Sequence, residues 1–141
     1  IVPNSSPFSE IANTLSILEI IYNNEIPEPS LKNILENINE PSTTLFATDN
    51  HFVVVTNFSK NYTSLFKLEN GVLKFRNTVG SMPLADRMTM IRKGVFKDFF
   101  FVAALSDIHI LRIENGSLVR FAKIEFGDGY ENMLGDLDIE P

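Results

Sequence analysis

Cysteine and tryptophan are both absent from the 141 residues. Without cysteine the chain can form no disulfide, thiolate nucleophile, cysteine-ligated zinc site or iron–sulfur cluster. No window approaches the roughly 18 consecutive apolar residues of a membrane-spanning helix. The first segment lacks the charged start and apolar run of a secretory signal. The chain begins at Ile1 rather than Met, which we interpret as a cut or processed start.

Compositional bias is lacking as well. With 44% hydrophobic and 21% charged residues, 7 glycines and 7 prolines, the chain has the composition of one globular domain. The lack of cysteine favours an intracellular location, either cytoplasmic or nuclear. A secretory compartment is the alternative, because N-x-[ST] patterns there would accept glycans. These patterns occur at Asn4, Asn57, Asn61 and Asn115.

The net charge of −6 is distributed in blocks. Residues 1–59 carry seven acidic and one basic group, residues 60–123 carry eleven basic and five acidic groups, and residues 124–141 carry six acidic groups only. A basic block of this kind can face an anionic partner. Alternatively, the three blocks neutralise one another within the fold. The overall pI of about 4.8 argues against a dedicated nucleic-acid module.

The first forty residues show apolar side chains at helical spacing. Ser6 and Pro7 fit the start of a helix, Pro27 and Pro29 interrupt the pattern, and Ser30 fits a second start. Intervals of three and four residues separate the apolar positions of the two segments, which are Ile11, Leu15, Leu18 and Tyr22, then Leu31, Ile34, Leu35 and Ile38. The pattern predicts a helical hairpin over residues 1–42.

From Thr43 onward the apolar pattern becomes that of strands. Short runs rich in Val, Phe, Thr and Leu alternate with turn residues, and they fall into two groups of four. The runs are residues 45–48, 51–58, 63–68 and 72–79, then 88–91, 99–105, 108–113 and 117–126. We therefore predict two units of four antiparallel strands over residues 43–126, followed by an acidic C-terminal segment, residues 127–141.

The two units repeat each other in sequence. Residues 66–71 return as residues 111–116 at an offset of 45, and residues 51–55 correspond to residues 98–102 at an offset of 47. Both units contain an Asn-Gly pair before the last strand. A two-residue type I′ turn requires positive φ at both positions, which Asn tolerates and Gly adopts freely. The pairs predict two equivalent hairpins.

A four-strand unit that recurs about every 45 residues resembles a blade of a β-propeller, and the large family to which it is similar is the WD-repeat-like propellers. The Trp-Asp dipeptide of that family is absent. The resemblance implies a binding platform and carries over no catalytic residue. A propeller has about four to eight blades. The chain is therefore part of a larger propeller, or is completed by another surface, or closes as a small eight-strand barrel or sandwich.

No motif for catalysis or for a cofactor is present. His51 and His109 have no partner at metal-ligand spacing, and no Gly-x-Ser-x-Gly nucleophile turn occurs. The acidic C-terminal segment does not match the register of a calcium loop. We expect no enzyme, no cofactor and no metal site. The hypothesis with the least support is an enzyme whose catalytic residues are dispersed along the chain.

One cluster of residues is a candidate for partner binding. Basic groups in a connector and a turn of the second unit accompany an aromatic residue, as interfaces often show; these are Arg87, Arg92, Lys93, Lys97 and Phe96. The alternative is that the basic groups only solubilise the rim while the apolar groups fill the core.

The sequence predicts a non-catalytic protein-interaction or scaffold module within a larger propeller-containing protein or assembly. Its partner would be another protein or the remainder of the parent chain. Because two blades leave sheet faces open, we also expect self-association. The alternative function is a small β-barrel that binds an apolar ligand under a helical lid.

Overall fold

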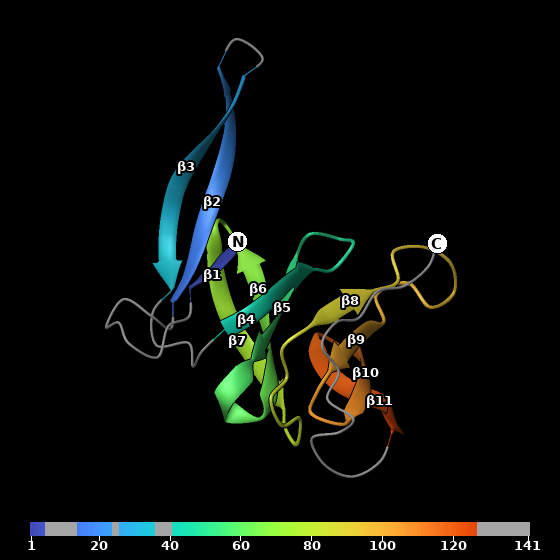
Figure 1. Cartoon of the computed structure of the whole chain (residues 1–141). Coiled ribbons are helices and arrows are strands. Elements are labelled where there is room, and N and C mark those ends of the chain that lie inside the picture. Colours follow the sequence, from blue (N-terminus) through green and yellow to red (C-terminus); the bar gives the residue numbers. More distant parts are fainter. Residues whose placement is uncertain (5–13, 24–25, 36–40, 127–141) are drawn as a thin grey trace.

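The computed structural model describes residues 1–4, 14–23, 26–35 and 41–126 (Figure 1). Within these ranges the chain forms three antiparallel sheets that follow one another along the sequence. We call them the N-terminal, central and C-terminal sheets. The helices in the described part amount to one 3-10 turn at Phe58–Lys60. None of the described helices is long and apolar enough to cross a membrane.

The central and C-terminal sheets are the two predicted four-strand units. The central sheet consists of β4 (Pro41–Phe46), β5 (Phe52–Asn57), β6 (Tyr62–Glu69) and β7 (Val72–Val79). The C-terminal sheet consists of β8 (Met88–Met90), β9 (Phe100–Ala103), β10 (Asp107–Glu114) and β11 (Ser117–Glu125). In each sheet the strands lie side by side in sequence order, as in a propeller blade. No closed barrel is formed by the described strands, so the barrel alternative is wrong.

The two Asn-Gly turns are confirmed. Asn70 and Gly71 have φ values of 52° and 76°, and Asn115 and Gly116 have values of 50° and 76°. Both positions of each turn therefore have the positive φ that a type I′ hairpin requires. The strand pairs behind the turns also share an irregularity of register at the same offset of 45, between Leu65 and Phe66 and between Ile110 and Leu111.

The predicted N-terminal helical hairpin is wrong, because these residues form strands. The N-terminal sheet consists of β1 (Val2–Asn4), β2 (Thr14–Asn23) and β3 (Ile26–Leu35). In β2 almost every second or third residue is Ile, Leu or Tyr. Apolar residues at helical spacing therefore occur by chance in a segment whose composition favours a strand. The two prolines fit β3 because it is the edge strand. Residues 5–13 and 36–40 of the predicted hairpin lie outside the described residues.

The N-terminal sheet extends the repeat by one unit toward the N-terminus. The β2–β3 hairpin closes with the pair Asn23 and Ile26, 46 residues before the closing pair Glu69 and Val72 of the β6–β7 hairpin. The β10–β11 hairpin closes 45 residues later still. In addition, β1 contacts β4, and the β2–β3 hairpin stands beside the central sheet and extends beyond it (Figure 1). The chain thus contains three successive blade-like sheets.

Two apolar cores lie on the two faces of the central sheet. Alternate residues of β5 point to opposite faces: Val53 and Val55 pack with Leu15 of the N-terminal sheet, whereas Val54 packs toward the C-terminal sheet. The core between the central and C-terminal sheets is the larger, with buried Leu65, Met82, Met88, Met90, Phe100, Val102, Leu111 and Leu118. The central sheet is therefore covered on both faces, which is how neighbouring blades pack.

Polar side chains join the central and C-terminal sheets at three places. The Asn77 amide on β7 donates to the carbonyl of Leu118 on β11 (2.8 Å) and accepts from its N–H (2.9 Å). Asp98 accepts from the N–H and hydroxyl of Thr48. The carbonyl of Asp86, just before β8, accepts from the hydroxyl of Thr43 (2.6 Å). These contacts fix the loops at both ends of the strands.

Candidate functional site

The connections between the strands lie at two opposite ends of the stacked sheets. The β4–β5, β6–β7, β8–β9 and β10–β11 connections lie at one end, which we call the loop rim. The opposite end carries the β5–β6, β7–β8 and β9–β10 connections. Figure 1 shows the β4–β5 turn and the β8–β9 loop projecting toward the same side of the molecule.

The structure separates the predicted partner-binding residues. Arg92, Lys93, Phe96 and Lys97 lie together in the β8–β9 loop on the loop rim, and all four are exposed. Arg87 precedes β8 and therefore lies at the opposite end of the sheet, where its Nε is 3.6 Å from the carboxylate of Asp86. Four of the five residues can thus form one surface, and Arg87 is not part of it.

The β8–β9 loop presents apolar side chains to solvent. Phe96 is 55% exposed and Val95, which the sequence analysis did not single out, is 90% exposed. The loop is held in place by backbone hydrogen bonds, including that from the N–H of Asp98 to the carbonyl of Ile91 (2.9 Å), and by edge-on packing of Phe96 on Phe99. Its apolar tip is therefore presented on a fixed backbone.

The cations of this loop have no acidic partners within the part of the chain that the structure describes. Among the described residues, Arg92, Lys93 and Lys97 form no ion pair. Most other basic residues have an acidic neighbour. In Glu69, for example, Oε1 lies 2.8 Å from Nζ of Lys67 and Oε2 lies 2.7 Å from Nζ of Lys74. The hydrogen bonds from these two lysines lower the pKa of Glu69 to about 2. Counting the described residues alone, the basic groups of the loop rim that lack an acidic partner are concentrated in the β8–β9 loop.

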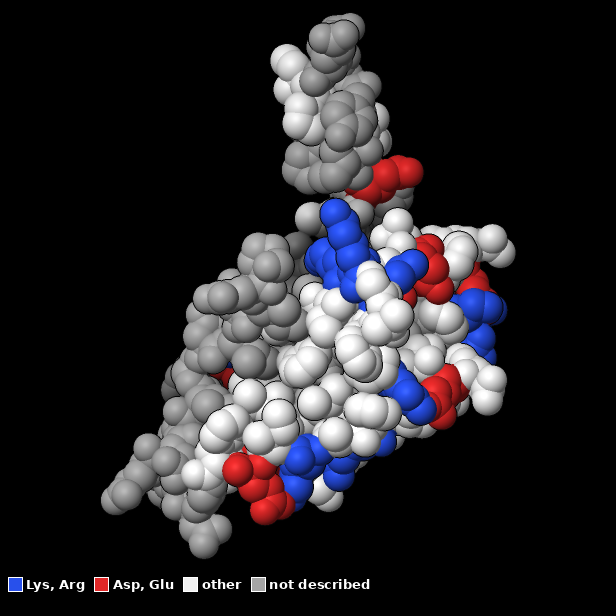
Figure 2. All heavy atoms as spheres, turned by 90° about the vertical axis from the view of Figure 1, so that its right-hand side faces the viewer, with Lys and Arg blue, Asp and Glu red and all other residues white. Residues whose placement is uncertain are grey.

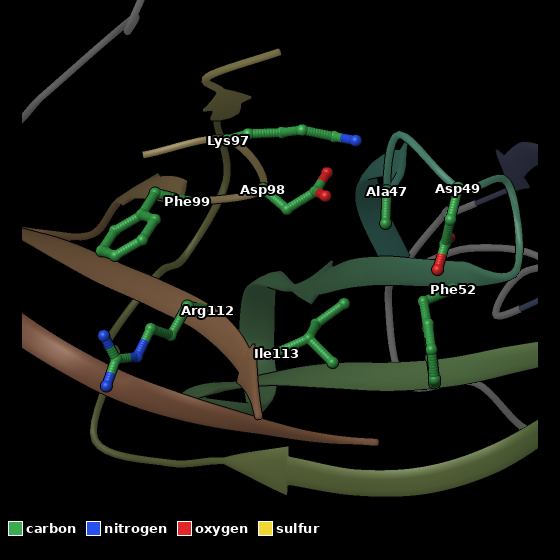
Figure 3. Close-up of a pocket in the computed structure, with 8 residues that line it drawn as sticks. All are labelled: Ala47, Asp49, Phe52, Lys97, Asp98, Phe99, Arg112 and Ile113. Atoms are coloured by element: carbon green, nitrogen blue, oxygen red, sulfur yellow. The ribbon is translucent and has the colours of Figure 1, made fainter. Parts of the chain in front are cut away.

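A pocket of about 270 Å³ lies beside this loop, between the central and C-terminal sheets. Figure 3 shows its lining residues, with Lys97 extending across it and the carboxylate of Asp98 below. The carboxylate of Asp98 already accepts two hydrogen bonds from Thr48. Arg112 is ion-paired with Glu114, and its Cζ lies 4.7 Å from the centre of the Phe121 ring. Lys97 is therefore the cation at this pocket that remains available to a ligand.

The buried histidine of the C-terminal sheet lies apart from this surface. His109 is fully buried, and burial, followed by the charge of Arg120, lowers its pKa to about 4, so the imidazole is neutral at pH 7. It does not line the pocket beside Lys97. In the described part of the chain, no three His, Asp or Glu residues come close enough together to hold a metal ion.

The glycosylation patterns differ in accessibility. The side chain of Asn57 is buried and donates to the hydroxyl of Ser64 (3.0 Å), so the folded chain does not present it to an enzyme. Asn61 and Asn115 are exposed at turns. The cellular location of the chain stays a prediction.

Comparisons with known proteins identify the fold but no family. No protein-family model matches the chain, and no curated protein matches it in sequence. Among solved structures, a protein from Lactobacillus plantarum matches with a TM-score of 0.65 and 12% identity over 81% of this chain and 36% of its own length. A functionally unknown protein from Desulfotomaculum acetoxidans matches with a TM-score of 0.64 and 18% identity over 80% and 35%.

A third solved structure carries a suggested activity in its name. It is a protein from Bacteroides uniformis named as a candidate 6-phosphogluconolactonase, with a TM-score of 0.59 and 16% identity over 82% of this chain and 35% of its own. These are β-propeller-type proteins, so the likeness shows a propeller-type fold and no WD-repeat family. The present chain spans little more than a third of each.

Proposed function

We propose that the chain is a non-catalytic binding module of a propeller-type protein, and that it binds an acidic protein segment through the β8–β9 loop. The observation that carries the proposal is the combination of Arg92, Lys93 and Lys97, without acidic partners among the described residues, with the exposed Val95 and Phe96. Loops on a rigid sheet scaffold are the usual place for binding residues.

An acidic peptide fits this surface in charge and in polarity. Cations at the rim of an interface accelerate association and select partners of opposite charge, whereas an aromatic side chain supplies contact area at little cost in conformational entropy. The pocket beside Lys97 could take an apolar side chain of the same peptide against Phe52 and Ile113. The loop and the pocket would thus form one continuous site.

Lactone hydrolysis is the second candidate, favoured only by the name of the structure from Bacteroides uniformis. Of the two carboxylates at the pocket, Asp98 accepts hydrogen bonds from Thr48 and Asp49 accepts one from the N–H of His51. Both carboxylates therefore already accept hydrogen bonds within the chain. Incubation with 6-phosphogluconolactone tests this candidate, and hydrolysis above the uncatalysed rate would replace the binding-module proposal.

The proposal is tested by charge reversal in the loop. A labelled synthetic peptide rich in Glu and Leu is titrated with the chain, and binding is followed by fluorescence anisotropy. We expect Lys93→Glu/Lys97→Glu to weaken binding about tenfold, since lost exposed ion pairs contribute up to about 1 kcal/mol each. Lys60→Glu is the matched control, because Lys60 is exposed at the opposite end of the sheets.

Two outcomes would contradict the proposal. Equal loss of binding in the Lys60→Glu control would show a general effect of net charge rather than a site. Binding to phosphatidylserine vesicles without binding to the peptide would assign the loop to a membrane surface instead.

A further inference from the structure

The outer face of the C-terminal sheet, which points away from the central sheet, is apolar and partly exposed. Phe99, Phe101 and Ile110 on this face are half-buried, and Phe121 and Ile124 are 51% and 44% exposed. Figure 2, which shows the molecule from this side, has mostly uncharged atoms across the middle. A monomeric protein rarely leaves a large apolar face uncovered without a function for it.

The repeat shows which residues of the two sheets are equivalent. In the central sheet, Val53 of β5 pairs with Phe46 at the end of β4. In the C-terminal sheet, Phe100 of β9 pairs in the same way with Met90 at the end of β8, so Val53 and Phe100 are equivalent. By this register Val54 is equivalent to Phe101. The register irregularity and the Asn-Gly turn of the C-terminal sheet both lie 45 residues after those of the central sheet, so Leu65 is equivalent to Ile110.

The equivalent residues have the same character but different surroundings. Val54 and Leu65 are 0% exposed because the C-terminal sheet covers them. Phe101 and Ile110 occupy the same positions one unit later and remain half-buried. Phe52 and Val79, which also pack toward the C-terminal sheet, likewise have apolar equivalents in Phe99 and Ile124. The C-terminal sheet thus repeats the surface by which the central sheet is covered.

The cation at the rim end of β8 follows the same pattern. Thr48 of the central sheet donates to the carboxylate of Asp98 in the following sheet, whereas Thr43 donates to the backbone carbonyl of Asp86. One unit later, the register of β8 places Arg92 in the position of Thr48. A following sheet with a carboxylate like that of Asp98 would therefore meet an arginine.

We propose that the outer face of the C-terminal sheet is a docking surface for a further four-stranded sheet of the same repeat on the same polypeptide. The covering sheet would present apolar residues to Phe101 and Ile110 and an acidic residue to Arg92. The same-chain source is argued from the matched solved structures, in which the region like this chain is little more than a third of a single longer chain.

The first test compares two surfaces of the 141-residue chain. Phe101→Lys/Ile110→Lys changes the outer face, and Val54→Lys/Leu65→Lys is the matched control at the equivalent covered positions. We expect the outer-face variant to keep the wild-type unfolding midpoint and to lower both self-association and the binding of an apolar dye at least tenfold. We expect the control to unfold the chain. Unfolding of both variants alike would show that the face is already covered within this chain, which would overturn the proposal.

The second test adds the proposed sheet. In an extended chain, residues 1–124 are followed by a second copy of residues 80–125, so that a second Asp98 meets the first Arg92. We expect one cooperative unfolding transition, a higher midpoint than for the 141-residue chain and at least tenfold less dye binding. Phe101→Lys/Ile110→Lys in the first copy should abolish all three effects.

Two results of these experiments would contradict the proposal. The first is an added sheet that unfolds separately or leaves dye binding unchanged. The second is a stoichiometric nanomolar dimer of the 141-residue chain that the outer-face variant dissociates, because this would assign the face to a second copy. Peptide binding through Lys93 and Lys97 is measured separately, so failure of this proposal leaves the proposed function intact.

Discussion

Acidification should destabilise the chain through His109. Its backbone pairs with Val102, so the imidazole faces the core between the central and C-terminal sheets. Burial is the main reason that its pKa is lowered to about 4 from 6.5. The charges nearby partly oppose each other: Arg120 and Lys123 lower the pKa, while Asp107, 3.8 Å from Nε2, raises it. The neutral imidazole is the form that the folded chain accommodates.

The sign and size of the effect follow from proton linkage. The unfolded chain binds a proton at His109 below about pH 6.5, whereas the folded chain does so only near pH 4, so the free energy of unfolding falls as the pH decreases between these values. At about 1.36 kcal/mol per pKa unit, the total loss is about 3 kcal/mol. Protonation of Glu69, whose pKa is about 2, adds further loss mainly below this window.

Urea denaturation followed by circular dichroism between pH 7.5 and pH 4 measures this effect. His109→Gln should lower stability at pH 7 but remove most of the slope between pH 6.5 and pH 4. His51→Gln, at an exposed histidine, is the matched control and should keep the wild-type slope. If His109→Gln loses stability with the same slope as the wild type, the reasoning is refuted.

Two further predictions concern the repeat and the packing of the sheets. Gly71→Val and Gly116→Val should each lower the free energy of unfolding by about 1 kcal/mol or more, because a β-branched residue is strained at φ near 76°; thermal melts unchanged in both would argue against type I′ turns. Asn77→Ala should cost about 1–3 kcal/mol by leaving both backbone groups of Leu118 without their partner, and a chemical melt equal to that of the wild type would show that this bridge is dispensable.

The strands of residues 43–126 were predictable because their sequence signals are local, whereas Pro41 and Ser42, which begin β4, fall within the predicted helical hairpin. Alternating apolar residues fix the faces of a strand, and an Asn-Gly pair fixes the turn that joins two strands. The N-terminal strands were not predictable in this way. A segment as rich in Ile and Leu as β2 has apolar residues at both helical and strand spacing, so its sequence pattern fits either structure. The pairing of β2 with β3 decides that it forms a strand.

The candidate site was only partly predictable for a different reason. Closeness in sequence grouped Arg87 with Arg92, but the short strand β8 between them places the two side chains at opposite ends of the sheet. The contacts of Asp98 with Thr48 and of Asn77 with Leu118 join residues more than forty positions apart. No local pattern marks such pairs, because they depend on how one sheet packs on the next.

Amide-resolved NMR of the chain during titration with the acidic peptide tests the central claim most directly. We predict that shift changes are confined to the β8–β9 loop, residues 91–99, and to the neighbouring β4–β5 turn. Shift changes at the opposite end, in residues 58–61 and 80–87, or the absence of any change at saturating peptide, would contradict the assignment of the loop rim as the binding surface.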